Sequence, residues 1–246
     1  MTKTAGGLSR IWSLLTGSPR LTFVGHSHLW AIGDGLQETT RDIRVIDFWK
    51  ISDPFAQNEL SVIDTALPSP VRGPIVSLIG GSRYNTLTLY ESARPFDFVL
   101  PSDPSPPETD CEMLPYHAVR TALLSLMESN FRLLKAVRER TKGRVYHLNA
   151  PPPWGEDRDP ADYPKDPWMQ VSHRFGDRKL RLKTSRLETD LMREFCATND
   201  IVLIDVPEEA KDAEGFLRTE YFADLMHANT AYGRLVLAHV LGVVKK

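Results

Sequence analysis

Short apolar runs alternate along the chain with longer segments in which apolar residues recur every three or four positions. The short runs are rich in β-branched and aromatic residues and end at glycine, proline or polar residues, which is typical of buried strands. They lie at residues 21–24, 43–49, 74–79, 144–149 and 201–204. A short accessory strand is also predicted at residues 96–100.

Helical periodicity covers much of the chain between these strands. Apolar residues recur from Leu114 to Val137, and Gly143 follows as a stop signal, so a long amphipathic helix is predicted there. Further helices are predicted near residues 28–36, between 180 and 199, and after Asn229, whose side chain can cap a helix. Five apolar strands separated by helices predict a three-layer α/β/α fold with a parallel sheet covered on both faces.

Proline marks the loops of this fold. The chain has 246 residues, which suits a single domain over residues 1–246, with residues 1–20 as an N-terminal extension. Many of its 18 prolines gather in two segments, 101–113 and 151–168. Because proline fixes φ and removes a hydrogen-bond donor, both segments are predicted loops. Ligands bind beyond the carboxyl ends of parallel strands, and we expect both loops to overhang that edge.

The charge balance argues against partners that are recruited by charge. Lys and Arg total 30 and Asp and Glu total 32, so the chain has no overall field to attract nucleic acid or an anionic membrane. No run approaches the roughly 18 apolar residues of a membrane span. The apolar patch at residues 11–15 is also too short for a secretory signal. Together with only two cysteines, these features favour a cytoplasmic protein.

Chemically active side chains lie just after two predicted strands and just before the last helix. The three sets are Gly25-His26-Ser27-His28, Gly80-Gly81-Ser82-Arg83-Tyr84-Asn85 and Asp224-Leu225-Met226-His227. A serine, a histidine and an aspartate at one edge of a sheet are the groups that nucleophilic acyl transfer needs. We therefore expect Ser27 to be the nucleophile, His227 the base and Asp224 the residue that orients the imidazole.

Acyl transfer also needs donors for the oxyanion that forms on the substrate. The backbone N–H of Ser27, beside a helix N-terminus, is one expected donor. Gly81 lets the backbone approach a substrate closely, and Ser82 or Asn85 could add a further hydrogen bond. His26, His28, Tyr84 and Trp154 are the residues expected to shape the substrate site, Trp154 either by stacking on a sugar ring or by packing in the core.

The order of these blocks resembles the SGNH (GDSL-type) hydrolases over nearly the whole chain. Gly25-His26-Ser27 stands where that family has Gly-Asp-Ser, and Asp224-Leu225-Met226-His227 matches its Asp-x-x-His block. The resemblance implies a flavodoxin-like strand order 2-1-3-4-5 and a serine esterase or acyl hydrolase that needs no cofactor or metal. It also implies a small-molecule or carbohydrate ester as substrate, with carbohydrate O-deacetylation as the preferred reaction.

Departures from the family pattern leave two alternatives open. Gly80-Gly81-Ser82-Arg83 replaces Gly-x-Asn-Asp, so Ser82 stands at the oxyanion asparagine, and no glycine of the second family block is found around residues 52–61. A non-catalytic ligand-binding or glycan-binding relative is therefore one alternative. The other is a metal-dependent hydrolase, because His26 and His28 could join Asp224 and His227 as ligands. The acyl group and the oligomeric state remain open.

Overall fold

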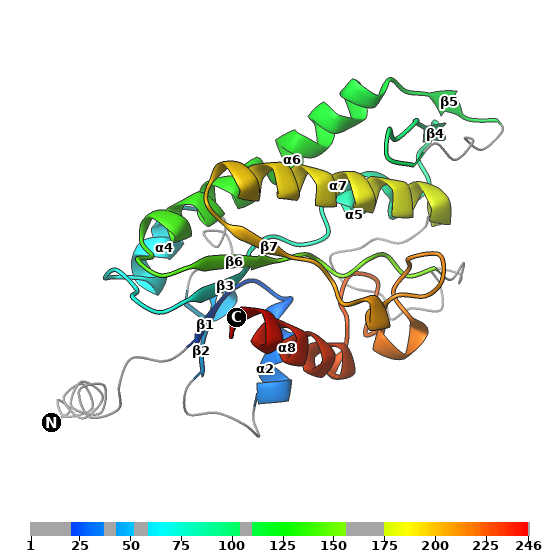
Figure 1. The fold of residues 1–246 in the computed structure, drawn as a ribbon. Helices are drawn as coiled ribbons and strands as arrows, with labels where there is room; N and C mark the ends of the chain where they lie inside the picture. Colours follow the sequence, from blue (N-terminus) through cyan, green and yellow to red (C-terminus); the bar gives the residue numbers. More distant parts are fainter. Residues whose placement is uncertain (1–20, 37–42, 52–58, 104–109, 156–174, 246) are drawn as a thin grey trace, which may run out of the picture.

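Five parallel strands form the central sheet of the computed structural model, which describes residues 21–36, 43–51, 59–103, 110–155 and 175–245 (Figure 1). The strands are β1 (Leu21–Gly25), β2 (Ile43–Asp47), β3 (Ile75–Leu78), β6 (Val145–Leu148) and β7 (Val202–Ile204). Their spatial order is β2-β1-β3-β6-β7. Taken in chain order, this is 2-1-3-4-5, so the predicted fold class and strand order are confirmed.

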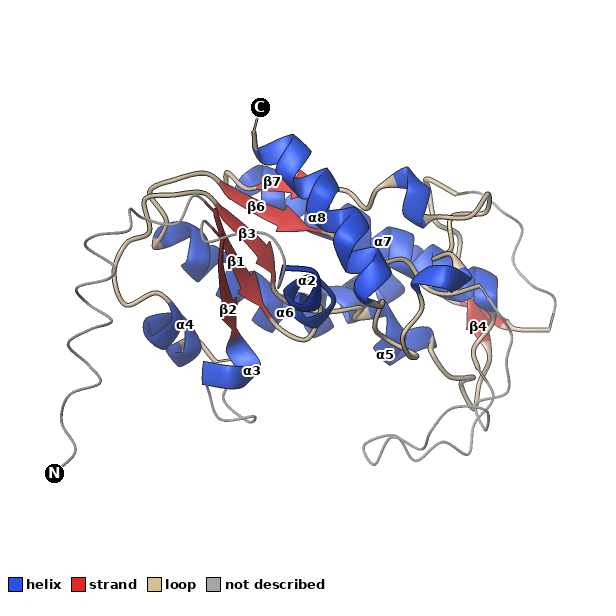
Figure 2. Ribbon diagram, turned by 90° about the horizontal axis from the view of Figure 1, so that it is seen from below, coloured by secondary structure: helices blue, strands red, loops and turns tan. Residues whose placement is uncertain are grey.

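Helices cover both faces of the sheet and complete the three layers. On one face lie α4 (Ser61–Ala66), α6 (Tyr116–Glu139) and α7 (Arg178–Thr198), and on the other α2 (Leu29–Leu36) and α8 (Thr230–Val244). Figure 2, seen from below, shows α2 and α8 on the near face and α6 on the far one. Alternate strand residues supply the two cores, because successive side chains point to opposite faces: Val24 and Ile75 pack under α6, whereas Phe23 and Val76 pack under α8.

The carboxyl ends of β1 and β3 lie side by side, which places the segments that follow them together. Gly25 is paired with Leu78 in the register of the two strands. A Cβ atom at Gly25 would lie 2.4 Å from the carbonyl oxygen of Leu78, and the φ angle of Gly25 is +157°. Only glycine therefore allows β1 to end so close to β3.

The second strand is shorter than predicted. It ends at Asp47, and residues Phe48–Ile51 form a short helix, α3. The Asp47 carboxylate accepts a hydrogen bond from the backbone N–H of Trp49 at 2.9 Å. This local bond competes with the strand pairing and starts the helical turn. Phe48 and Trp49, the aromatic residues that suggested a longer strand, therefore lie in this helix, where Phe48 is buried and Trp49 is exposed.

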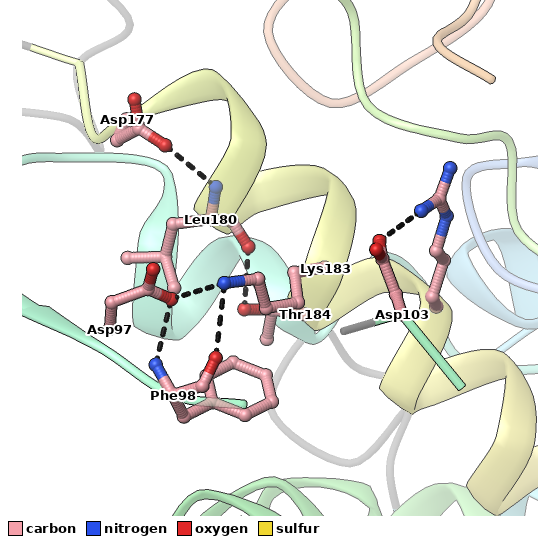
Figure 3. A network of polar contacts seen from close by, with 8 residues as sticks. Asp97, Phe98, Asp103, Asp177, Leu180, Lys183 and Thr184 are labelled. Atoms are coloured by element: carbon pink, nitrogen blue, oxygen red, sulfur yellow. Dashed lines mark hydrogen bonds and ion pairs between the residues drawn. The ribbon is translucent and has the colours of Figure 1, made fainter. Parts of the chain in front are cut away.

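The accessory strand is confirmed in part. It covers only Phe96–Asp97 (β4) and pairs in parallel with β5 (Glu112–Met113), which lies inside the segment predicted as a loop over residues 101–113. A buried ion pair fixes β4 to α7: Lys183 Nζ lies 2.6 Å from Asp97 Oδ1 and donates to the Phe98 carbonyl oxygen at 3.0 Å (Figure 3). β4 and β5 lie beyond the start of α6, away from the sheet (Figure 1).

Three short helices complete the described fold. α5 (Tyr84–Thr88) follows β3, and two 3-10 helices, η2 (Glu208–Ala210) and η3 (Thr219–Tyr221), lie between β7 and α8. The expected extension over residues 1–20 and residues 156–168 of the second proline segment lie outside the described residues. No helix in the described ranges combines the length and the hydropathy needed to cross a membrane.

Candidate functional site

Ser27 lies in the turn that joins β1 to α2, at the carboxyl edge of the sheet. The backbone N–H of His26 still donates to the Leu78 carbonyl oxygen, at 3.4 Å, and the N–H of Trp30 already donates to the carbonyl oxygen of Ser27, at 2.9 Å. The serine is thus held between the last sheet contact and the first turn of the helix. This placement leaves its side chain free to face the segment that precedes α8.

His227 meets Ser27 from the opposite end of the chain. Its Nε2 lies 2.9 Å from Ser27 Oγ, although 200 positions separate the two residues. Its Nδ1 lies 2.8 Å from Asp224 Oδ2. Asp224 also accepts the backbone N–H groups of Met226 and His227, at 2.8 and 2.7 Å. The three predicted residues therefore form one continuous chain of hydrogen bonds.

The turn from Asp224 to His227 is fixed by the start of α8. Asn229 caps that helix by accepting the N–H of Ala231 at 2.9 Å, and its amide donates to the Glu220 and Phe222 carbonyl oxygens. The predicted cap at Asn229 is confirmed. Because the cap binds both the helix and the loop before it, His227 is held at a defined distance from the sheet edge.

Hydrogen bonding keeps Asp224 ionised. Partial burial raises the pKa of this carboxyl group, but its bonds to the His227 imidazole and to the Met226 and His227 N–H groups outweigh the burial and lower its pKa overall. An ionised carboxylate accepts a hydrogen bond from the Nδ1–H of His227, which leaves Nε2 as an acceptor toward the serine hydroxyl.

A cavity of about 280 Å³ lies above this chain of hydrogen bonds. Its wall includes Ser27, Asp224 and His227, together with residues from α2, the β3–α5 loop, the end of β6 and α7. From the second proline segment, Pro151 lines the cavity, and its carbonyl oxygen accepts the hydroxyl of Tyr84 at 3.4 Å. Residues 101–103 of the first segment do not line the cavity, but Ser102 lines a neighbouring pocket that shares Asn149 and Ala150 with it.

His28 and Tyr84 line the cavity, as expected for residues that shape a substrate site. The His28 ring lies 5.7 Å from the His227 ring, measured between centroids. Burial, and then the positive charge that His227 can carry, lower the pKa of His28 to about 3. His28 is therefore neutral at neutral pH and does not compete with His227 for a proton.

His26 and Trp154 do not line the cavity, which corrects the expectation for both residues. His26 Nδ1 accepts the backbone N–H of Gly80 at 3.1 Å, so this imidazole ties the end of β1 to the β3–α5 loop. Trp154 is only 5% exposed, and its ring packs against Phe175 and Phe222 at centroid distances of 4.9 Å. Its role in the structure is packing, since a covered ring has no face to offer a sugar.

The histidines do not converge as the metal alternative requires. His26 is committed to Gly80, whereas His28 faces His227 and Gly81. In the ranges that the structure describes, no group of three or more His, Cys, Asp or Glu side chains is placed to hold a metal ion.

Two backbone donors are available near Ser27. The N–H groups of Ser27 and Gly81 make no hydrogen bond within the described part of the chain, and both residues line the cavity. Ser82 and Asn85, the other expected oxyanion residues, are not among its lining residues. Asn85 is buried in the first turn of α5 instead.

Solved structures share this architecture. The chain is similar to a candidate platelet activating factor from Streptococcus pneumonia, with a TM-score of 0.52 and 15% identity over 96% of this chain and 88% of the other. The chain has the fold of the SGNH hydrolases.

Two further structures overlap less closely. A GDSL-like lipase from Bacteroides thetaiotaomicron has a TM-score of 0.46 and 12% identity, over 97% of this chain and 96% of the other. A candidate SGNH hydrolase from Slackia heliotrinireducens has a TM-score of 0.47 and 15% identity, over 92% of this chain and 100% of the other. No family model and no curated protein matches the sequence.

The cavity is also lined by polar and aromatic residues that were not predicted as site residues, among them Trp30, Asn130 and Glu188. Asn130 and Glu188 are buried polar residues on the apolar faces of α6 and α7. A polar residue at an otherwise apolar helical position needs a partner or a function, and this signal in the sequence could have found both.

Glu188 holds the β3–α5 loop. Its carboxylate accepts the backbone N–H of Arg83 at 3.2 Å and that of Tyr84 at 2.6 Å. Burial raises the pKa of Glu188 to about 7, although the two N–H donors and the charge of Arg83 act in the opposite direction. The loop that carries Gly81 is thus anchored to α7.

Trp30 supports His227 from α2. The two rings stack with their centroids 5.8 Å apart and an interplanar angle of 28°. The indole N–H donates to Asp47 Oδ2 at 3.2 Å, which ties the tryptophan to the end of β2. An aromatic face beside an imidazole stabilises the protonated form of that ring.

Proposed function

We propose that the protein is a serine hydrolase that cleaves carboxylic esters. The observation that carries this proposal is the continuous hydrogen-bond chain from Ser27 Oγ through His227 to Asp224, with distances of 2.9 and 2.8 Å, at the wall of a cavity. Three groups in this order meet the geometric requirement for an activated serine nucleophile. Their position at the carboxyl edge of the parallel sheet, where ligands bind in such folds, supports the proposal.

The proton follows the hydrogen bonds. His227 Nε2 takes the proton of Ser27 as Oγ attacks the ester carbonyl carbon, and the imidazolium is stabilised by the Asp224 carboxylate. When the tetrahedral intermediate collapses, the C–O bond to the alcohol breaks and His227 returns the proton to the leaving oxygen. Water then attacks the acyl-serine by the same route and releases the acid. An alcohol in place of water would give acyl transfer instead.

The free N–H groups of Ser27 and Gly81 support the proposal, because the carbonyl oxygen becomes negatively charged in the intermediate. Preorganised donors at that position stabilise charge without reorganisation. The cavity of about 280 Å³ is at the small end for ligand sites and fits a short acyl group such as acetyl. The substrate class that we propose is therefore a small or carbohydrate ester with a short acyl chain.

Hydrolysis of p-nitrophenyl acetate tests this function. We expect turnover in the wild-type protein and its loss in Ser27→Ala, because no other hydroxyl is bonded to His227 in the described residues. Ser125→Ala, an exposed serine on α6, is the matched control and should behave as the wild type. Turnover that persists in Ser27→Ala contradicts the proposal. Sugar binding without turnover of any short-chain ester would favour the non-catalytic alternative.

A further inference from the structure

One buried amide in the cavity has an uncommitted donor. Asn130 lies on α6, is 2% exposed and lines the same cavity as Ser27. Its Oδ1 accepts a hydrogen bond from Arg83 Nη2 at 3.0 Å. Its Nδ2 donates no hydrogen bond to any other group in the part of the chain that the structure describes. An amide N–H₂ group in a cavity wall that has no acceptor in the protein is available to a ligand.

Arg83 decides which way the amide faces. The guanidinium can only donate, so it selects the oxygen of Asn130 and leaves Nδ2 on the opposite side. Turning the amide over would set two donors against each other. The orientation of Nδ2 is therefore fixed before any ligand binds, which is the property that an electrostatic stabiliser needs.

The amide lies against the loop that faces the nucleophile. A Cβ atom at Gly80 would lie 2.6 Å from Asn130 Nδ2, and the φ angle of Gly80 is +92°. Glycine at this position thus makes room for the amide as well as for the turn. The same loop contacts both residues that flank Ser27: Gly80 donates its N–H to His26, and a Cβ atom at Gly81 would lie 3.4 Å from His28 Nε2. The β3–α5 loop thus contacts Asn130 as well as the neighbours of the serine.

A second asparagine in the same cavity shows the ordinary arrangement. Asn149 Nδ2 donates to Asp205 Oδ1 at 2.9 Å, so its amide is already satisfied by the protein. Asn229, a third asparagine of the cavity wall, donates its amide to the Glu220 and Phe222 carbonyl oxygens. Of these three asparagines, Asn130 alone makes no donor hydrogen bond within the described residues.

We propose that Asn130 Nδ2 is a donor of the oxyanion hole, alongside the backbone N–H groups of Ser27 and Gly81. The inference rests on the proposed ester hydrolysis and names a residue that the sequence pattern did not indicate. Asn130 then supplies the side-chain donor for which Ser82 is not placed, since Ser82 does not line the cavity. Arg83 and Gly80 act as positioning residues, because the first orients the amide and the second admits it.

The test is the kinetics of p-nitrophenyl acetate hydrolysis by Asn130→Asp. Aspartate keeps the acceptor for Arg83 and the shape of the side chain but replaces the N–H₂ donor with an oxygen. We expect kcat to fall by about 10²–10³ with KM nearly unchanged, because the lost bond forms in the transition state. Inhibition by a boronic acid, which mimics the tetrahedral intermediate, should weaken by a similar factor.

Two further variants make the result decisive. Asn130→Ser has no added charge and takes the place of Asn130→Asp in the same assays if the aspartate variant does not fold. Asn199→Ala removes a half-buried amide that donates to the Phe195 carbonyl oxygen at the end of α7, and should change kcat less than about twofold. A kcat of the folded Asn130 variant within threefold of the wild type overturns the role of Asn130. If Ser27→Ala is inactive in the same assay, the proposed function stands regardless.

Discussion

The two walls of the cavity are built in different ways. On the serine wall, Asp224 and His227 belong to one short turn, and Ser27 meets them through a single long-range contact. On the opposite wall, the β3–α5 loop is held by side chains from two helices: Glu188 on α7 binds its backbone, and Asn130 on α6 binds Arg83. In the proposed reaction, the first wall carries the groups that move protons. The second carries the groups that stabilise the developing negative charge.

The difference teaches how a divergent site can keep its chemistry. The proton-transfer groups need both the right residue types and a close mutual geometry, so the Asp-x-x-His turn resembles the family pattern. Oxyanion donors need only an N–H group at the right point, and different elements can provide it. The predictions that follow separate the two walls.

The largest effect is expected on the serine wall. His227→Gln keeps a polar side chain beside Ser27 but removes the base, so we expect kcat for p-nitrophenyl acetate to fall on the order of 10⁴-fold. Steady-state kinetics at pH 7.5 measure this, with circular dichroism to verify that the variant is folded. A loss of less than tenfold would show that His227 is not the base.

Removing the anchor of the opposite wall should act mainly on stability. Glu188→Ala leaves the N–H groups of Arg83 and Tyr84 without their acceptor, and we expect a loss of about 2–4 kcal/mol in the free energy of unfolding. Urea denaturation measures it. Glu194→Ala is the matched control on the same helix, because its pair with Arg120 is solvent-exposed and should contribute less than about 1 kcal/mol. Equal losses of unfolding free energy in the two variants would contradict the anchoring role of Glu188.

The raised pKa of the Glu188 carboxyl group predicts that the free energy of unfolding depends on pH. Its pKa in the folded protein is about 7, above the ordinary value of 4.5, so the folded state holds this proton more tightly than the unfolded state. The contribution of Glu188 is fully present below pH 4.5 and is lost as the pH rises toward 7 and above. His28 and His147, whose pKa values are lowered to about 3 and about 4, act in the opposite direction as the pH falls below 6.5.

Glu188→Gln isolates the carboxyl group from these histidines, because they are present in both proteins. The stability of the wild type relative to Glu188→Gln should decrease between pH 5 and pH 7.5. Urea midpoints at four or five pH values in that range measure the difference. A constant difference would show that Glu188 does not titrate there.

The smallest effect is expected from the ring behind the base. Trp30→Ala removes the aromatic face that stacks on His227, and we expect kcat to fall about two- to fivefold, from an interaction of about 0.5–1 kcal/mol. Trp30→Phe keeps an aromatic face and should retain most of the activity. Equal kcat values for the alanine variant and the wild type would show that the stack does not stabilise the imidazolium.

The sequence was sufficient to predict the layers and the Ser27–His227–Asp224 contact. These follow from apolar periodicity and from the rule that the carboxyl ends of parallel strands share one edge, whereas the strand order was implied by the resemblance to the SGNH hydrolases. The helix at Phe48–Ile51 was missed because its cause is a single hydrogen bond from Trp49 to Asp47. Local competition of this kind does not alter the hydrophobic pattern.

The contacts of the opposite wall could not be predicted, because they join distant segments. Asn130 is 47 positions from Arg83, and Glu188 is 105 positions from it. Neither helix has a motif that names its partner. Only the packing of α6 and α7 on one face of the sheet brings these side chains to the loop after β3.

Covalent labelling tests the central claim most directly. A fluorophosphonate reacts with a serine only when a base activates it, and peptide mass spectrometry locates the adduct. The account predicts a single adduct on the peptide that contains Ser27, no adduct in Ser27→Ala and strongly slowed labelling in His227→Gln. Unchanged labelling of Ser27→Ala, or no adduct in a wild-type protein that is shown to be folded, would contradict it.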